Sequence, residues 1–276
     1  MTLRRAARGI ALAQLSVLLA AAVFGRWIAF GADAAELQRR LPAASATELL
    51  SWWAIATQST AGIVLGASLV AAILGVALGA SSVYGDNGAG GLVLRLVEFL
   101  GAVPALILAG ILRLGDPSGG VLGLFASLAL LRTLEVAQLV RAHVLLIIPS
   151  DFVEASRALG ASRRWQLRSH VLPRLAQPLA VNLLLGAATL VGLEAALGFV
   201  GLGLPSTIPS WGGGLAALAS GGRFAAVACV SASIGATCAA LYGLAISLER
   251  RQRRAPGYAA RGVEPLRELG AEGRGS

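Results

Sequence analysis

The sequence predicts an all-α polytopic membrane protein, and three features of the 276-residue chain support this prediction. Hydrophobic residues make up 56% of the chain and charged residues only 13%, whereas soluble domains carry about 25% charged residues. The mean hydropathy is +0.74. Apolar runs long enough to cross a bilayer recur along the chain, and arginines are unevenly distributed among the segments between them.

Six apolar segments meet the length of about 20 residues that a helix needs to cross the hydrocarbon core. They cover residues 9–30, 57–83, 92–113, 119–141, 177–200 and 223–248. The first follows Arg4, Arg5 and Arg8 and precedes Ala-Asp-Ala, as a secretory signal would. Its apolar run is longer than the roughly 7–15 residues of a signal core, so we expect a retained span.

The arginine distribution predicts how these spans are oriented. With the N-terminus inside and six spans, the 150–175 loop and the chain after Arg250 also lie inside, and all three regions are rich in arginine. The segments left outside, 31–56 and 201–222, hold only Arg39 and Arg40. Because cytoplasmic loops carry the excess of basic residues, we expect both termini to be cytoplasmic.

A charged stretch, residues 151–173, lies between the fourth and fifth expected spans and predicts two short helices. Asp151 is placed to cap the first helix, with Glu154 three positions later as in a capping box. Gly160 offers the left-handed conformation that ends this helix. Ser162 is placed to cap the second helix, which we expect to stop at Pro173.

Three interpretations fit such a helix pair. A DNA-binding helix–turn–helix has a similar turn glycine, an interfacial loop would set its arginines against anionic lipid headgroups, and a docking element would bind another protein. The loop is tethered to spans at both ends, so a recognition helix would be held against the bilayer and away from a major groove. We therefore expect no nucleic-acid partner and favour docking, with the lipid-surface loop as the alternative.

The same stretch resembles the EAA loop of ABC-transporter permeases. EASRALG, at 154–160, is followed nine residues later by HVLP, at 170–173, which is similar to the E-A-A-x-x-x-G and I/H-x-L-P motif with Ser156 in place of the second alanine. Downstream, LEAALGFVGLGLPSTIPSW, at 193–211, resembles a stretch of the C-type permease subunit of the dipeptide/oligopeptide/nickel importer group. Two blocks in the right order are more specific than either alone, and the resemblance covers about residues 57–250.

This resemblance implies the type I ABC importer permease fold and a set of partners in the bacterial plasma (inner) membrane. The chain would form half of a translocation pathway for peptides or a related small solute, with a second and different permease subunit. Two cytoplasmic ATPase subunits would use the ATP, and an extracytoplasmic substrate-binding protein would deliver the substrate. The alternative is a non-transporting membrane scaffold or regulator that docks another partner through the same helix pair.

The resemblance also implies which residues couple the chain to the ATPase subunits, since the family's EAA loop is a coupling helix seated in a groove of the ATPase. The implied coupling residues are Phe152, Glu154, Ala155, Ser156, Leu159, Gly160, Leu172 and Pro173. We expect an apolar anchor from Phe152, Val153, Ala155 and Leu159.

The expected organisation is an N-terminal span with an extracytoplasmic segment (1–56), a permease core (57–250) with the coupling loop 150–175, and a disordered cytoplasmic tail (251–276). Two departures from the family pattern leave the substrate open between peptide, chelated nickel and other solutes. Residues 31–56 lack the L-G-T-D-x-x-G-R-D run of the group, and the fourth span has Thr133-Leu134 where the group has Trp-Pro.

Charged side chains within the expected spans are candidates for the translocation pathway, because such groups are rare in hydrocarbon. Glu194 lies midway along the fifth span and matches the family's glutamate. Contact with a cationic substrate group or a proton, and a hydrogen bond that fixes helix packing, are both open for it. Arg132 and Glu135 are three residues apart on one helical face, so a self-neutralising pair is favoured over a substrate contact.

The segment 201–211 is rich in glycine and proline and is expected at the external mouth. Irregular backbone persists near membrane depth only where it is buried in protein or lines a cavity. Its site candidates are Pro209 and Trp211, and we expect Trp211 to anchor at the membrane interface or to touch a substrate-binding protein.

Two absences from the sequence limit the chemistry of this chain. There is no lysine, and a Walker A phosphate loop needs one. We therefore expect a transport subunit without its own ATPase site, with no enzyme activity and no cofactor bound by this chain. The only histidines are His143 and His170, so a metal site within the chain is not expected.

Overall fold

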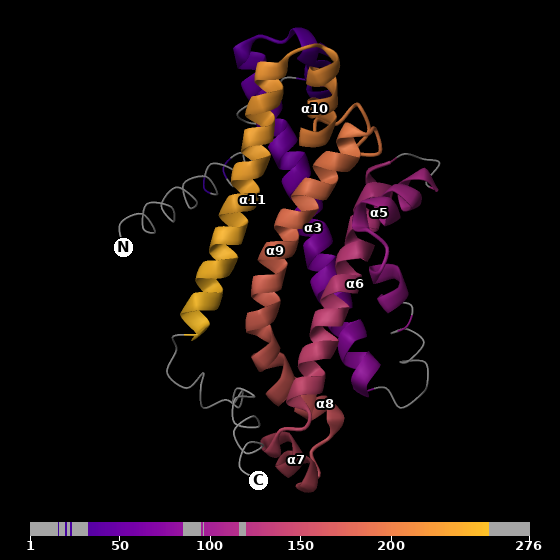
Figure 1. Ribbon diagram of the computed structural model, residues 1–276, viewed down its shortest axis with the longest axis vertical. Helices are drawn as coiled ribbons and strands as arrows, with labels where there is room; N and C mark the ends of the chain where they lie inside the picture. The colour runs from indigo at the N-terminus through magenta and orange to yellow at the C-terminus, as the bar shows by residue number, and fades with distance from the viewer. Residues whose placement is uncertain are drawn as a thin grey trace, which may run out of the picture.

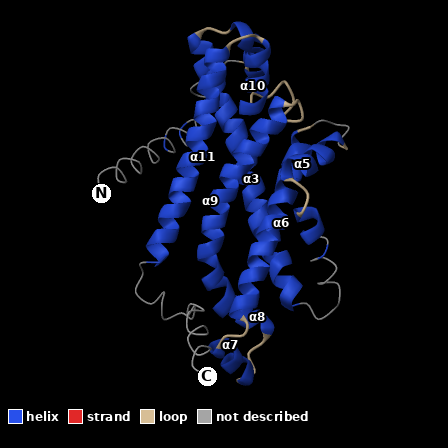
Figure 2. Cartoon of the chain, in the orientation of Figure 1, coloured by secondary structure: helices blue, strands red, loops and turns tan. Residues whose placement is uncertain are grey.

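The computed structural model describes residues 33–84, 95, 97–115 and 120–253, together with the isolated positions 16, 20 and 23. Long helices run side by side along one axis, and the regular elements in the described ranges are all helical (Figures 1 and 2). Four of these helices are long and apolar enough to cross a membrane: Ala46–Val83, Val121–Ile147, Leu167–Phe199 and Phe224–Arg251. The predicted all-α polytopic membrane fold is therefore confirmed. The first expected span, 9–30, and the tail from 254 lie outside the described residues apart from the three isolated positions.

Helix α3 (Ala46–Tyr84) is the span expected at 57–83, but it begins earlier. Its start is set by a capping box: the Ser45 N–H donates to Glu48 Oε2 at 2.7 Å, and the Glu48 N–H donates to Ser45 Oγ at 3.4 Å. The apolar run therefore predicts the membrane-crossing part of the helix, whereas polar caps outside that run determine where the helix begins.

The expected span at 92–113 is not one continuous helix in the described residues. Residues 97–101 are helical, the backbone turns over 102–104, and α5 (Ala105–Leu114) begins after Pro104. Proline has no N–H for the helical ladder, and its ring disfavours helical backbone at the preceding Val103. The break therefore follows from a single proline. The hydropathy of the segment as a whole does not reveal it, because the residues around Pro104 are apolar.

The long helices approach one another closely where one of them carries glycine. Helix α6 (Val121–Ile147) packs along α3, and a Cβ added at Gly79 of α3 would lie 2.5 Å from the Ala137 carbonyl oxygen of α6. Small residues such as glycine allow the backbones of two membrane helices to approach this closely. Helix α9 (Leu172–Phe199) packs against α3, α6 and α11 (Phe224–Arg253).

The two ends of this bundle carry different short elements (Figure 1). Helices α7 (Asp151–Ala158) and α8 (Arg163–Gln166) lie at one end. At the other end lie α2 (Ala34–Arg40), the 3₁₀ turn η1 (Leu41–Ala43) and α10 (Trp211–Ser220). The arginine-rich loop and the segment 201–222 are thus separated by the full length of the long helices.

The prediction that the second short helix stops at Pro173 is wrong. Residues Leu167–Val171 form a π-helical turn, η2, and the chain continues without a break as α9. The Leu172 N–H donates to the Leu167 carbonyl, one residue further back than in an α-helix. Pro173 then falls in the first turn of α9, where its missing N–H is tolerated. Continuous helical backbone therefore joins α8 to a membrane span.

Candidate functional site

The helix pair α7–α8 is the first candidate site, and its start differs from the expected one. Helix α7 begins at Asp151 itself, so the capping position belongs to Ser150. The Ser150 side chain does not cap the helix; its hydroxyl donates to the Ile147 carbonyl at 2.5 Å, at the end of α6. The predicted Asp151 cap is wrong because the last turn of α6 already places Ser150 in extended backbone directly before the helix.

The predicted turn between the two helices is confirmed. Gly160 has φ +82°, and the hydrogen bonds around it form a Schellman motif: its N–H donates to the Arg157 carbonyl at 2.9 Å, and the Ala161 N–H donates to the Ser156 carbonyl at 3.0 Å. The predicted cap at Ser162 is also present, since its Oγ accepts from the Trp165 N–H at 3.3 Å. The pair is thus a hydrogen-bonded unit of defined shape.

The side chains of this pair divide into an inner and an outer set. Val153 and Ser156 are buried against the chain itself, so Val153 is not part of an exposed anchor as expected. Leu159 is 89% exposed, and Glu154 and Ala155 are also exposed. The side chain of Phe152 lies outside the described part of the chain. Further on, Leu172 is half-buried and Pro173 is exposed.

Sequence reasoning missed Gln166, which fixes the angle of the pair. Its side chain is 1% exposed, and its Nε2 donates to the Ala161 carbonyl across the turn at 3.0 Å. Nearby, the rings of Trp165 and His170 meet edge to face with their centroids 5.0 Å apart, across the start of the π-helical turn. A single glutamine in an arginine-rich loop gives no sequence signal that it is buried.

Glu194, the second candidate, sits in a polar cluster that ties three helices together. Its carboxylate is fully buried, and its Oε2 accepts from Thr60 Oγ1 of α3 at 3.2 Å. The same Thr60 oxygen accepts from the Trp211 backbone N–H of α10 at 3.4 Å. The structure therefore places Glu194 in a contact that ties α9, α3 and α10 together, and the contact of Glu194 with a substrate group or a proton stays a prediction.

Trp211 is part of this cluster, so the expectation that it anchors at the membrane interface or touches a binding protein is wrong. Its side chain is 2% exposed, and its Nε1 donates to Thr57 Oγ1 at 3.2 Å. The reason is local: Ser210 caps α10 by accepting from the Gly213 N–H, which turns the first residue of that helix inward. Pro209 beside it is buried as well.

Arg132 and Glu135 form the predicted pair on α6, with a partner that the sequence did not reveal. Arg132 is 2% exposed; it donates to Glu135, and its Nη2 donates to both the carbonyl and the side-chain oxygen of Asn182 at 2.5 Å. Glu135, in contrast, has a side chain 46% exposed. The pair thus joins α6 to α9 and presents a carboxylate on its open side.

Gly186 makes the space that Arg132 occupies, and this gives a testable consequence. A Cβ at this position would lie 1.9 Å from Arg132 Cζ, so we expect Gly186→Ala to displace the guanidinium from Asn182 and Glu135. Breaking a buried charged contact costs up to about 3–5 kcal/mol. The apparent Tm in detergent should fall clearly below that of Gly192→Ala, since nothing lies within 4 Å of a Cβ at Gly192 of the same helix. Equal Tm values for the two variants would contradict the placement of Arg132.

The irregular segment after α9 is held by another arginine that the sequence analysis did not single out. Arg113 of α5 is 6% exposed; its Nε donates to the Leu202 carbonyl at 2.9 Å and its Nη2 to the Gly203 carbonyl at 3.0 Å. These carbonyls follow the end of α9, where acceptors lack helical partners. The carbonyl groups of this irregular backbone, near the end of a span, are thus hydrogen-bonded by a buried side chain, as is expected of irregular backbone near membrane depth.

The sequence of this chain is similar to those of known transport permeases. Residues 69–254 match the family model described as "Binding-protein-dependent transport system inner membrane component". The chain is 34% identical over 158 residues to the probable peptide ABC transporter permease protein y4tQ of Sinorhizobium fredii (57% of this chain, 53% of that protein). It is 33% identical over 149 residues to the di/tripeptide transport system permease protein DppC of Pseudomonas aeruginosa (54% and 48%).

A longer alignment is found with a putative peptide transport system permease protein of Brucella suis, which is 30% identical over 223 residues (76% of this chain, 74% of that protein). The chain spans about half the length of the first two relatives. Among solved structures, the inward-facing MetNI methionine ABC transporter matches with a TM-score of 0.54 at 22% identity, over 71% of this chain and 92% of that one. That likeness shows the fold. The family match covers more than half of the sequence, and the chain therefore belongs to the binding-protein-dependent transport system inner membrane component family.

Proposed function

We propose that this chain is a permease subunit of an ABC importer, and that α7–α8 couples it to cytoplasmic ATPase subunits. The observation that carries the proposal is the continuity of the helix pair with a membrane span. The pair is closed by the Schellman motif at Gly160, braced by Gln166, and joined through the π-helical turn to α9. A displacement applied at the exposed Leu159 therefore reaches α9 through hydrogen-bonded backbone and not through a flexible loop.

The excess of arginine in the segments between and beyond the spans supports an orientation with this end of the bundle in the cytoplasm. In that orientation both termini are cytoplasmic, and the segment 201–222 faces the substrate-binding protein. The chain binds no cofactor itself, and its partners, a second permease subunit and two ATPase subunits, use the ATP. The alternative is a scaffold that docks another partner through α7–α8 and carries no flux.

Peptides are the proposed cargo because the relatives are named as peptide, dipeptide and tripeptide permeases. The test is to isolate the tagged chain with its associated subunits from native membranes and to reconstitute the complex in liposomes with the co-purified binding protein. We expect uptake of a labelled tripeptide that requires ATP on the side of the ATPase subunits. Peptide accumulation that is independent of ATP, or a tagged chain that recovers no ATPase, would refute the importer proposal and favour a scaffold.

A further inference from the structure

The break before α5 opens a cavity against α6, and Glu135 of the pair with Arg132 also lines it. Its volume is about 250 Å³. Its wall combines the irregular segment with one face of α6: Leu100, Gly101, Ala102, Val103, Pro104, Ala105, Leu131, Leu134, Glu135 and Gln138. Apolar side chains form most of this wall, and the side-chain polar groups come from Glu135 and Gln138.

The backbone on the irregular side of this cavity has unused hydrogen-bonding groups. Within the described residues, the carbonyls of Ala102 and Val103 accept no hydrogen bond and the Ala105 N–H donates none, whereas the next donors, Ile107 and Leu108, both reach the Pro104 carbonyl. Pro104 interrupts the ladder that would otherwise pair these groups. These unpaired main-chain acceptors and this unpaired donor thus belong to residues that line the cavity.

The depth of the cavity along the span indicates that its walls, formed by α6 and the segment before α5, do not face lipid. Glu135 lies midway along the span Val121–Ile147, about 20 Å of helix from either end at ~1.5 Å per residue. Unpaired backbone and a half-exposed carboxylate do not face hydrocarbon at that depth, but they do line aqueous cavities. This face of α5 and α6 is therefore turned to the pathway or to a neighbouring subunit.

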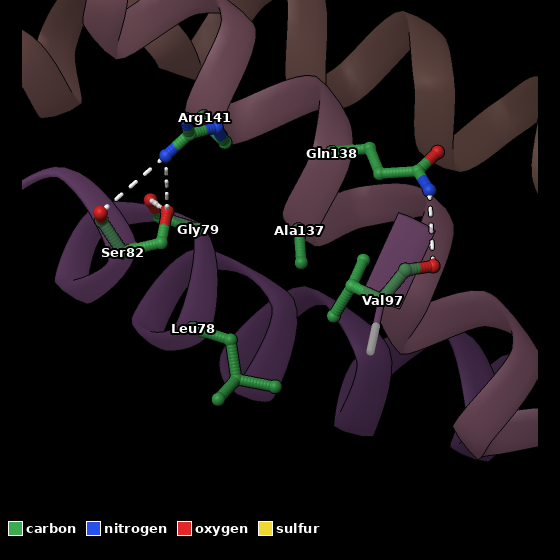
Figure 3. A pocket seen from close by; sticks show the side chains of 7 residues that line it. All are labelled: Leu78, Gly79, Ser82, Val97, Ala137, Gln138 and Arg141. Carbon is green, nitrogen blue, oxygen red and sulfur yellow. Dashed lines mark hydrogen bonds between the residues drawn. The ribbon is translucent and has the colours of Figure 1, made fainter. Parts of the chain in front are cut away.

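The carboxylate in the cavity is positioned by one partner and retains capacity for another. Arg132 donates to Glu135 Oε2, and among the described residues no donor reaches Oε1. Gln138 is similarly fixed: its Nε2 donates to the Val97 carbonyl at 3.3 Å, and its side-chain oxygen accepts from no described residue (Figure 3). Figure 3 shows the smaller neighbouring cavity, where Arg141 points to Ser82 and Gln138 points to Val97.

We infer that this cavity is a subsite of the pathway for the main chain of a short peptide, with its N-terminal ammonium on Glu135 Oε1. The inference rests on the proposed function and adds to it a location and a mode of recognition. A peptide backbone supplies N–H donors for the free carbonyls and C=O acceptors for the free N–H. The side chains of the peptide make no contact that this recognition requires, so peptides of different sequence fit.

The test measures capture of a photoreactive tripeptide by the purified complex without binding protein, comparing a free N-terminus with an acetylated one. A hydrogen bond to a charged group is worth about tenfold or more in affinity, so the wild type should capture the free-amine peptide at least about tenfold better. Glu135→Gln, which retains the shape of the side chain, should remove this preference. The matched control is Glu98→Gln, because Glu98 is exposed just before the break but does not line the cavity.

A second variant covers the case in which Glu135→Gln destabilises the Arg132 contact. Ala102→Leu fills the cavity from an exposed position and should lower capture of both peptides while the Tm stays near that of the wild type. Capture that retains its preference for the free amine in Glu135→Gln, or that is unaffected by Ala102→Leu, would overturn the subsite. Wild-type complex that imports peptides with ATP but shows no capture would overturn the subsite alone, whereas absence of ATP-dependent import would overturn the proposed function.

Discussion

Replacing Gly198 by alanine is expected to remove most of the folded protein from the membrane. A Cβ at Gly198 would lie 2.7 Å from the Gly212 Cα, and one at Gly212 would lie 2.6 Å from the Ala195 carbonyl oxygen. These contacts are between backbones, so no side chain can rotate away and α9 and α10 must separate. Overpacking a core costs about 1–3 kcal/mol where side chains can adjust, and we expect a loss above that range here.

The loss is measured as the yield of monodisperse protein in detergent and as its apparent Tm. Separation of α10 from α9 also breaks the contact chain from Trp211 through Thr60 to Glu194. Gly192→Ala is the matched control, because it adds the same methyl group to the same helix with nothing within 4 Å. If Gly198→Ala had the yield and Tm of the control, the close packing of α9 on α10 would be wrong.

Replacing Gly160 by valine is expected to abolish transport while leaving the membrane bundle folded. Gly160 has φ +82°, and nothing lies within 4 Å of a Cβ built there, so the effect comes from backbone conformation alone. A left-handed residue costs about 1–2 kcal/mol for ordinary amino acids, and a β-branched one is a genuine outlier there. The turn should therefore reorganise, and the angle between α7 and α8 and the position of Leu159 should change. We expect tripeptide uptake below one tenth of wild type.

Two further variants separate this effect from general strain. Gly160→Asn should retain much of the uptake, since asparagine tolerates the left-handed region. Gly222→Val introduces the same kind of strain at φ +70°, also with nothing within 4 Å, in the turn between α10 and α11 at the opposite end of the bundle. The ATPase subunit should still co-purify with the Gly222→Val variant. Wild-type uptake in Gly160→Val, or equal loss of ATPase recovery in both valine variants, would refute a specific coupling role for this turn.

The parts of the fold that sequence reasoning predicted are those set by local chemistry. Apolar run length located the long helices, and the glycine at 160 and the serine at 162 located the turn and the second cap. The errors fall where a neighbouring segment decides the outcome. Pro173 does not end a helix because a π-helical turn precedes it, and Ser150 takes the capping position from Asp151 because α6 ends there.

The candidate sites were predictable to a similar degree. The charge pair Arg132–Glu135 followed from spacing on one helix, but Asn182 and Gly186, which complete its environment, come from another helix. Trp211 has an apolar ring with one hydrogen-bond donor, and this residue type fits an interface position and a buried one equally well. In the structure its donor is satisfied in the interior by Thr57, which is distant in sequence. The cavity at the helix break depends on which face of α6 meets Pro104, and no single segment carries that information.

Photocrosslinking from the tip of the helix pair tests the coupling proposal most directly. A photoreactive amino acid would replace Leu159, which is 89% exposed beside the turn, and in a separate variant Leu122, which is 77% exposed at the opposite end of α6. After irradiation of native membranes, we expect the tagged chain to be linked to an ATPase subunit from position 159 and not from position 122. Labelling of the ATPase from both positions or from 122 alone, or no labelling from 159 in membranes that import peptide, would contradict the assignment of α7–α8 as the coupling element.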